Sequence, residues 1–372
     1  MHYFKIGTGF DMSVIDRVDE LNKKYSDTAR VSEFYGSVRT DAPLAARPDF
    51  RLPDLWDERL ETFIKAAHGI GVRVNYTINS IMPYGTKSNF VKSKYAIANT
   101  LAFLEEASVD LVTVGSPIML EFIKREFPNF KPDIEVSTIM HVDTLTQIKY
   151  LHDEYGVKKV CGSLLKNRDF TFTRKAVKLC ESLGMWYELM VNEFCGVGTT
   201  SYATHCIYRD SCYICHSTNR TASDAESFGN YPMDLCTAGR NANKANWLRS
   251  NFIRPEDLGL YEEYTGVNHF KITGRTGSSD YQMRTLEAYM SGSFDGDLLE
   301  LWKPLETIKQ ENVSDSVDYK IIPNKKLEGF VLPFIHGQVC ANEICGETCS
   351  YCQKFYDRVM DEIEREKAAK EK

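Results

Sequence analysis

Two groups of cysteines are the residues of this chain whose type and spacing could bind a metal. Nine of the eleven cysteines belong to these groups. The first group lies between residues 188 and 240 and comprises Cys195, Cys206, Cys212, Cys215 and Cys236. The second group lies further along the chain and comprises Cys340, Cys345, Cys349 and Cys352. Thiolates are soft ligands that favour zinc or iron–sulfur clusters. The sequence therefore predicts a metal centre in each group.

The spacing of the first group, C-x10-C-x5-C-x2-C-x20-C, favours an iron–sulfur cluster over structural zinc. Only its C-x2-C step matches a zinc knuckle, whereas a cluster accepts ligands from separate turns. The spacing of the second group, C-x4-C-x3-C-x2-C, is compatible with two interpretations. One is a structural zinc site that holds the C-terminal segment, and the other is a second iron–sulfur cluster that delivers electrons. Cys161 and Cys180 lie in apolar segments outside both groups, so we expect buried structural thiols there.

Four arginines lie in or beside the first cysteine group and the last expected strand: Arg209, Arg240, Arg254 and Arg275. Guanidinium groups bind carboxylates through two parallel hydrogen bonds, so these residues suit a dicarboxylate substrate. Arg275 is the strongest candidate because it is expected at the end of the last strand. For each arginine the alternative is a surface salt contact.

Glu193, two residues before Cys195, is a candidate acid–base group, although a helix cap or a salt bridge is an equally good interpretation. His205 and His216 flank cysteines and could donate protons or bind metal, but a solvent-facing or hydrogen-bonding role is favoured. The predicted catalytic residues are therefore Glu193, Arg209 and Arg275.

Eight short apolar runs alternate with amphipathic windows between residues 1 and 291. Runs typical of strands occur at 4–9, 29–37, 72–79, 110–115, 133–140, 157–163, 186–195 and 267–274. Helical windows occur at 11–24, 54–68, 92–106, 117–126, 142–152, 168–182, 253–264 and 280–291, with a further one near 243–252. Eight such units without hairpin signals predict an α/β fold, a (β/α)8 TIM-type barrel. A doubly wound sheet is less favoured, because no Gly-x-Gly-x-x-Gly follows the first strand.

Polar side chains follow the expected strands at the end where barrel active sites form. They are Asn75, Tyr76, Asn79, Ser137, Thr138, His141, Asn192, Glu193, Cys195 and Arg275. We expect all of them to face one pocket, with the long cysteine-rich loop after strand seven lying over it.

Two units are expected: a barrel over residues 1–305 with a cysteine-rich insertion at 195–240, and an extension over 306–372 with the second cysteine group and a charged helix. The net charge of −7 and the pI near 5.7 argue against a broad nucleic-acid surface. The chain has no signal-peptide pattern and no apolar run of membrane-spanning length. These features predict a cytoplasmic protein without membrane contact.

Several strings resemble a known family: ELMVNEFC, Cys206-Ile-Tyr-Arg209, IRPEDLGLYEEY, VNHFKITGRT and AYMSGSFDGDLLELW. Together they resemble the collagenase-like family of peptidases of unclassified mechanism, over residues 1 to about 305. The resemblance implies a (β/α)8-type fold with an oxygen-sensitive four-iron four-sulfur cluster held by four cysteines. Better-understood relatives in this family are implicated in oxygen-independent hydroxylation of RNA or a ubiquinone precursor, and at least some of them use prephenate as the oxygen source.

By that resemblance, Cys195 and Cys206 match the first two cluster ligands and Cys236 the last. The third ligand is either Cys212 or Cys215, since this chain has both. The chain departs from the family in the short spacing between its first two cysteines and in the added group at 340–352.

Three functions follow as hypotheses. The first is an iron–sulfur enzyme of the oxygen-independent hydroxylase type, acting on a small molecule such as a prephenate-like dicarboxylate or on an RNA base. The second is a metal-dependent, collagenase-like peptidase, although no His-Glu-x-x-His motif is present. The third is a non-catalytic scaffold for a partner subunit. A partner subunit or electron donor also fits the first hypothesis.

Overall fold

The computed structural model describes residues 1–40, 44–47, 51–55, 57–81, 90–193, 238–239, 242–275, 277–302 and 322–371. All five cysteines of the first group lie outside these residues, as do Arg209, Arg240, His205 and His216. The predictions made for them stay predictions.

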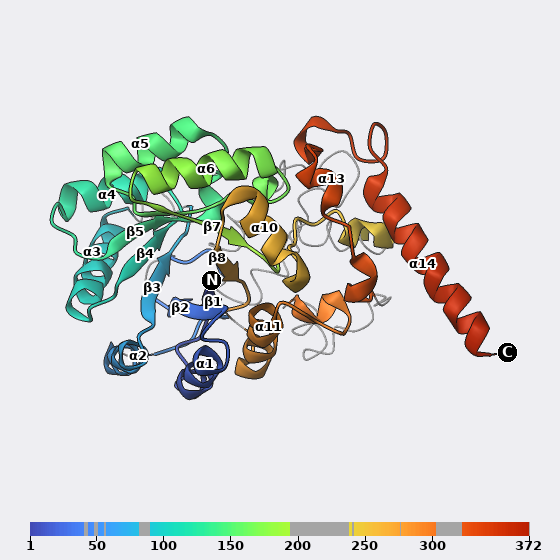
Figure 1. Cartoon of the computed structure of the whole chain (residues 1–372). Coiled ribbons are helices and arrows are strands. Elements are labelled where there is room, and N and C mark those ends of the chain that lie inside the picture. Colours follow the sequence, from blue (N-terminus) through green and yellow to red (C-terminus); the bar gives the residue numbers. More distant parts are fainter. Residues whose placement is uncertain are drawn as a thin grey trace.

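Eight parallel strands close into a barrel in the order β1-β2-β3-β4-β5-β6-β7-β8, which confirms the predicted fold class (Figure 1). The strands are β1 His2–Gly7, β2 Ala29–Gly36, β3 Arg73–Ile78, β4 Leu111–Val114, β5 Asp133–Val136, β6 Lys159–Cys161, β7 Trp186–Met190 and β8 His269–Ile272. The register between β1 and β8, with Tyr3 opposite His269, closes the ring.

Helices surround the barrel, one after each strand up to β6 and further ones after β7 and β8 (Figure 1). They are α1 Ser13–Lys24, α2 Asp57–Gly69, α3 Phe90–Glu106, α4 Pro117–Glu126, α5 Leu145–Tyr155, α6 Phe170–Ser182, α10 Leu258–Thr265 and α11 Ser279–Ser291. Local sequence fixes their ends. Thr144 and Gln147 form a capping box at the start of α5, and Gly156 ends this helix in the left-handed conformation.

The strands are shorter than the apolar runs that predicted them. The run at 133–140 leaves the sheet after Val136, because the Ser137 side chain accepts a hydrogen bond from the backbone of Ile139 and caps the single turn η3 Thr138–Met140. Strand β7 ends at Met190, so Asn192 and Glu193 follow the strand and do not lie on it. The helix expected near 243–252 is only the turn η6 Lys244–Trp247.

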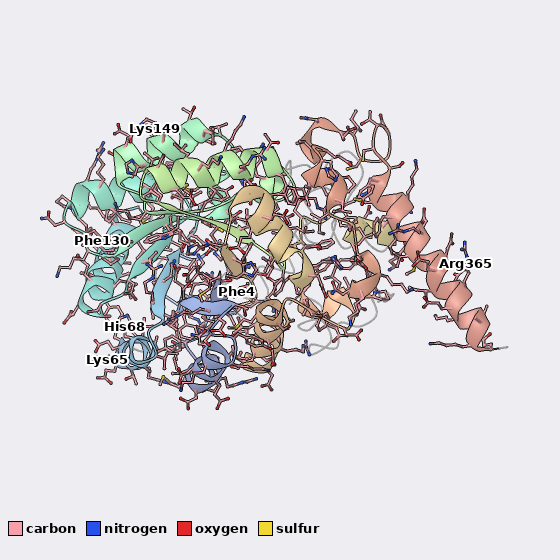
Figure 2. The ribbon with its side chains drawn as sticks, viewed as in Figure 1. Phe4, Lys65, His68, Phe130, Lys149 and Arg365 are labelled. Carbon is pink, nitrogen blue, oxygen red and sulfur yellow. The ribbon has the colours of Figure 1, made fainter. Side chains whose placement is uncertain are left out.

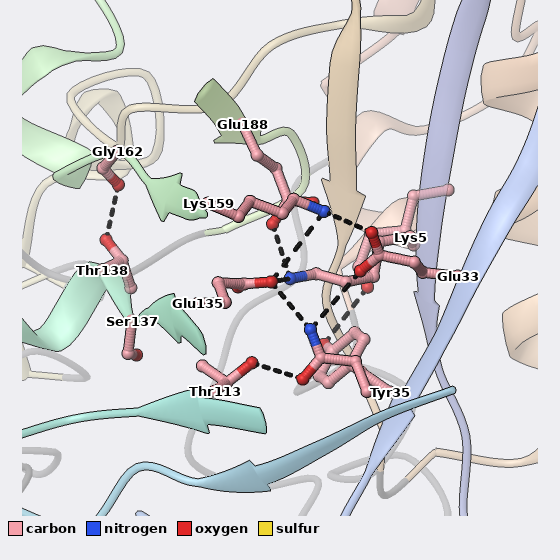
Figure 3. Close-up of polar contacts among 12 residues, drawn as sticks. Lys5, Glu33, Tyr35, Thr113, Glu135, Ser137, Thr138, Lys159, Gly162 and Glu188 are labelled. Carbon is pink, nitrogen blue, oxygen red and sulfur yellow. Dashed lines mark hydrogen bonds and ion pairs between the residues drawn. The ribbon is translucent and has the colours of Figure 1, made fainter. Parts of the chain in front are cut away.

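Lysine and glutamate side chains fill the middle of the barrel (Figure 3). We call Lys5, Glu33, Glu135, Lys159 and Glu188 the interior network; each is at most 1% exposed. Lys5 Nζ lies 2.6 Å from Glu135 Oε2 and 2.8 Å from Glu188. Lys159 Nζ lies 2.8 Å from Glu33 and 2.7 Å from Glu188. Because helices cover the outward-facing positions with apolar contacts, the inward-facing positions are free to carry paired charges.

The interior network should make the barrel sensitive to acid. Burial by itself would raise the pKa of Glu33, but the ammonium groups of Lys159 and Lys5 outweigh it and lower this pKa to about 2. The pKa of Glu188 is lowered in the same way. An unfolded glutamate titrates near pH 4.3. A carboxyl group whose pKa is lowered by folding stabilises the fold above the unfolded pKa, and this stabilisation is lost as the pH falls towards the folded value.

We therefore expect the free energy of unfolding to fall steadily between about pH 4 and pH 2. Urea unfolding followed by far-UV circular dichroism would measure it. Salt at high concentration serves as the control, because it screens surface pairs and should leave the loss from buried carboxylates in place. A free energy of unfolding that stays constant down to pH 2 would contradict the pairing in the interior network.

Residues 322–371 add a helical extension beside the barrel (Figure 1). The extension contains η10 Asn324–Leu327, α13 Leu332–Ile335, η11 Cys340–Asn342 and α14 Tyr351–Lys370, and it follows η8 Leu298–Leu301 of the barrel. Phe330 packs in both directions: its ring lies 5.0 Å from that of Phe355 within the extension and 5.6 Å from that of Phe252, which follows η6. The far half of α14, which carries Arg365, projects away from the barrel (Figure 2). The predicted boundary at residue 305/306 lies outside the described residues.

Among the described residues, no helix has both the length and the apolar character needed to cross a membrane.

Candidate functional site

Arg275 is buried at the carboxyl end of the barrel, three residues after β8. Its side chain is 6% exposed, and its Nε makes no hydrogen bond within the described residues. No described carboxylate pairs with it. Burial, followed by the nearby charge of Arg47, lowers the pKa of Arg275 to about 9. A buried cation without a counter-charge is costly, so this position is suited to receive an anion.

Glycine at the end of β1 allows Arg275 to occupy this place. A Cβ atom on Gly7 would lie 2.7 Å from the Cβ of Arg275, which is closer than such atoms approach. Tyr35 and Tyr76 lie near enough to the guanidinium group for their phenol groups to influence its pKa. Tyr35 Oη donates to Ile272 O at 3.2 Å, and Tyr76 Oη accepts from Val38 N at 3.3 Å. We call the space around these residues the barrel mouth.

A second arginine, Arg47, reaches the barrel mouth from the segment between β2 and α2. Its Nη1 donates to Ala46 O at 2.9 Å, and Ala46 N donates to Asn79 Oδ1 at 3.0 Å. Asn79 Nδ2 in turn donates to Ser137 Oγ at 3.4 Å. These bonds tie the Arg47 segment to the ends of β3 and β5. The barrel mouth therefore presents two guanidinium groups, of which the sequence predicted only Arg275.

Lys271 is a further residue that the sequence prediction missed. It lies on β8 with 5% of its side chain exposed, and its Nζ is 4.4 Å from the centre of the Tyr35 ring. Lys5 and Lys159 each contact two or three carboxylates, but Lys271 pairs with none among the described residues. Burial and the charge of Lys5 lower the pKa of Lys271. A lower pKa leaves a larger fraction of the amine unprotonated, and the unprotonated amine is the form that can act as a general base.

Three residues that the sequence placed at the substrate pocket form hydrogen bonds within the fold instead. Asn75 lies inside the barrel, where its amide donates to Glu135 at 2.8 Å. Asn192 donates to Thr273 O at 3.3 Å and to Leu301 O at 3.0 Å, so it joins β7 to β8 and to the following segment. Arg254 pairs with Asp257 at 2.7 Å. In each case hydrogen bonds to neighbouring elements occupy the side chain.

The remaining predicted residues follow the carboxyl ends of β5 and β7. Thr138 Oγ1 donates to Gly162 O at 2.7 Å, and His141 adopts a left-handed backbone with φ 50°. Glu193 is partly buried and directly precedes the segment 194–237, so its acid–base role stays a prediction. Cys161 and Cys180 are 0% and 1% exposed, which confirms that they are buried thiols.

Comparison with known proteins decides the family. The model of peptidase family U32 matches residues 44–293. The chain belongs to peptidase family U32. This confirms the resemblance to the collagenase-like peptidases that the sequence indicated.

An uncharacterized protease of Methanocaldococcus jannaschii is 24% identical over 260 residues, which cover 69% of this chain and 68% of the relative. Among solved structures, the U32 peptidase Mk0906 is similar with 12% identity and a TM-score of 0.43, over 73% of this chain and 92% of that one. N-(5'-phosphoribosyl)anthranilate isomerase from Pyrococcus furiosus is similar with 7% identity and a TM-score of 0.38, over 79% and 98%. The U32 assignment agrees with an enzyme, and none of these comparisons supports hydroxylase chemistry.

In this U32 chain the second cysteine group converges as its spacing predicted. Cys340, Cys345, Cys349 and Cys352 all line one pocket, which we call the thiol pocket, together with Arg249 and Gln338. Gln338 Nε2 lies 3.2 Å from Cys349 Sγ, and Cys352 Sγ lies 3.6 Å from Leu248 O. The thiol pocket therefore joins the extension to the segment that carries η6.

Proposed function

We propose that this protein is an enzyme that binds a carboxylate-bearing substrate in the barrel mouth, and that its activity is peptide hydrolysis. The observation that carries the proposal is the buried guanidinium group of Arg275, which has no carboxylate partner among the described residues. Arg47 adds a second positive charge beside it. Membership of the U32 family and the similarity to a protease support peptides as the substrate class.

In this proposal each described residue has a definite role. Arg275 and Arg47 hold a carboxylate of the peptide, which a terminal carboxyl group supplies. Lys271, whose pKa is lowered, accepts a proton from the attacking water and returns it to the nitrogen of the leaving amine. Tyr35 lies against Lys271 and beside Arg275, so it links the proton acceptor to the carboxylate-binding group. The contribution of Glu193, of Arg209 and of a metal held by the first cysteine group stays a prediction, because the group and Arg209 lie outside the described residues.

The experiment is a peptide-cleavage assay with the full chain, purified without oxygen to preserve any cluster. Peptides with a free C-terminal carboxyl group would be compared with the same peptides carrying a C-terminal amide, and products identified by mass spectrometry. We expect cleavage of the free-acid series and much weaker cleavage of the amides. Cleavage that Lys271→Met leaves intact would remove Lys271 from the mechanism. An absence of cleavage in both series would overturn the proposal of a peptidase.

A second candidate is an iron–sulfur enzyme of the oxygen-independent hydroxylase type. The observation that favours it is the convergence of four thiols on one pocket, in a chain that carries five more cysteines at 195–236. A four-iron four-sulfur cluster would be held by Cys195, Cys206, Cys236 and either Cys212 or Cys215. Arg275 and Arg47 would then bind a dicarboxylate such as prephenate, or an RNA phosphate. An iron–sulfur absorption that a dicarboxylate perturbs, in protein that cleaves no peptide, would favour this candidate.

A further inference from the structure

Three short pieces of chain supply the cysteines of the thiol pocket. Gly346, with φ +91°, allows a tight loop in which its N–H donates to Cys349 O at 2.8 Å. This loop pairs Cys345 with Cys349. The turn η11 supplies Cys340, and the first turn of α14 supplies Cys352. A loop held by its own backbone hydrogen bonds gives the thiols a fixed arrangement before any metal binds.

Two arginines, Arg168 and Arg249, and one carboxylate, Glu343, lie at the thiol pocket. Arg168, which follows η4 Leu164–Lys166, is 3% exposed and lies against the Cys340 thiol. Its Nη2 donates to Leu248 O at 2.9 Å, the same carbonyl that Cys352 Sγ approaches. No carboxylate pairs with Arg168 among the described residues. Arg249, the residue after Leu248, also lines the pocket.

Aromatic rings hold the Arg168 guanidinium group in place. The ring centres of Phe252, Phe330 and Phe334 lie 5.2, 4.9 and 5.1 Å from its central carbon. Cation–aromatic contacts stabilise the charge but do not neutralise it. A thiolate-bound metal centre carries negative charge and would neutralise it, so the pocket and Arg168 are electrostatically complementary.

The spacing of the sulfur atoms indicates which metal centre fits. Four thiolates at about 2.3 Å from one zinc ion stand roughly 3.8 Å from one another. Within the described residues, one group of three His, Cys, Asp or Glu side chains has its ligand atoms all within 4.8 Å of one another. This group consists of Glu135, Cys161 and Glu188. No three sulfur atoms of the thiol pocket are therefore that close. In a four-iron four-sulfur cluster each of the four thiolates binds a different iron atom, so the sulfur atoms stand farther apart than they do around one zinc ion.

The group formed by Glu135, Cys161 and Glu188 is not itself a metal site. The ammonium groups of Lys5 and Lys159 already occupy the space between its two carboxylates.

We propose that Cys340, Cys345, Cys349 and Cys352 hold an iron–sulfur cluster, whose negative charge is balanced by Arg168 and Arg249. Asn167, next to Arg168, donates to Met190 O at the end of β7 at 2.7 Å. Arg168 and its chain neighbour Asn167 thus connect the thiol pocket to the end of β7. Gln338, through its N–H directed at Cys349, would tune the potential of the cluster. This assignment holds for either candidate function.

Metal analysis of the full chain tests the proposal. Iron, sulfide and zinc would be quantified in oxygen-free preparations of the wild-type chain and of a variant with all four pocket cysteines changed to serine. We expect the variant to lose the iron and sulfide of one cluster, with zinc well below one per chain in both proteins. Cys180→Ala, which removes a buried thiol outside the pocket, is the matched control and should change neither. Loss of one zinc per chain with unchanged iron, or no change in any metal, would overturn the proposal.

Arg249→Gln gives a test that leaves every sulfur ligand in place. Removing a positive charge beside an anionic cluster disfavours its reduced form, so the midpoint potential should shift to a more negative value. Redox titration followed by electron paramagnetic resonance would detect this shift. Lys354→Gln, on the exposed face of α14, is the control and should leave the potential unchanged. An unchanged potential in Arg249→Gln would argue against a cluster in this pocket.

Discussion

Replacing Lys159 by methionine is expected to lower the free energy of unfolding by about 3–5 kcal/mol, the usual cost of removing one partner from a buried ion pair. Lys159 is 1% exposed and contacts three carboxylates: Glu33 at 2.8 Å, Glu188 at 2.7 Å and Glu135 at 3.8 Å. Without its ammonium group, three buried carboxylates would share two cationic partners among the described residues: Lys5, which pairs with Glu135 and Glu188, and Arg73, which pairs with Glu33 at 2.8 Å. Urea unfolding at neutral pH measures the loss.

The matched control is Lys24→Met. Lys24 also forms a lysine–glutamate pair, with Glu287, but both side chains are about half exposed, so its removal should leave the stability unchanged. The pH dependence offers a second check. Lowering the pH protonates the carboxylates of the variant and removes their repulsion, so the difference between variant and wild type should shrink towards acid. A Lys159→Met chain as stable as the wild type at neutral pH would mean that the interior network contributes nothing to stability.

The sequence predicted the barrel because its apolar runs and amphipathic windows repeat eight times. Helix α4 runs over the predicted residues, since Ser116 caps it and Pro117 fits its first turn. Strand ends were less predictable. Ser137 ends β5 because its hydroxyl accepts a hydrogen bond from the backbone N–H of Ile139, and the apolar pattern of 133–140 does not reveal this bond.

The interior network was missed although the sequence contains a signal for it. Six strands carry a charged residue that is buried: the five residues of the interior network and Lys271. Four of the six, Lys5, Glu135, Glu188 and Lys271, stand between apolar neighbours in the sequence. In a barrel the apolar neighbours face the helices and the charged residue faces inward. The pattern alone could not give the partners, because they depend on the register and closure of all eight strands.

The candidate site was predicted in part. Arg275 was identified from its position after the last strand, which is a property of the fold. Arg47 was not, because it lies in an irregular segment between β2 and α2, where no periodicity indicates a direction. The convergence of the second cysteine group follows from its close spacing in sequence. The positions of Arg168 and Arg249 beside these cysteines depend on how the extension packs on the barrel, which only the structure provides.

Arg275→Met should weaken the binding of carboxylates and at the same time stabilise the chain without ligand. Loss of a buried charge-assisted contact costs roughly 2–5 kcal/mol of binding, which corresponds to a fall in affinity of about 30-fold or more. A buried cation without a carboxylate partner is unfavourable in the free protein, so an apolar side chain of similar length should raise the free energy of unfolding by about 1–3 kcal/mol. Activity and stability would then change in opposite directions, as expected of a binding residue.

Thermal unfolding with and without a free-acid peptide measures both effects in one experiment. The wild-type chain should be stabilised by the peptide and not by its C-terminal amide, because only a ligand that binds the folded state shifts the transition. Arg275→Met should start from a higher transition temperature and respond to neither peptide. Arg17→Met removes an exposed arginine that pairs with Asp280, and as the control it should keep the response of the wild type. If Arg275→Met were instead strongly destabilised, Arg275 would be holding the barrel together, and the case for an anion site in the barrel mouth would fail.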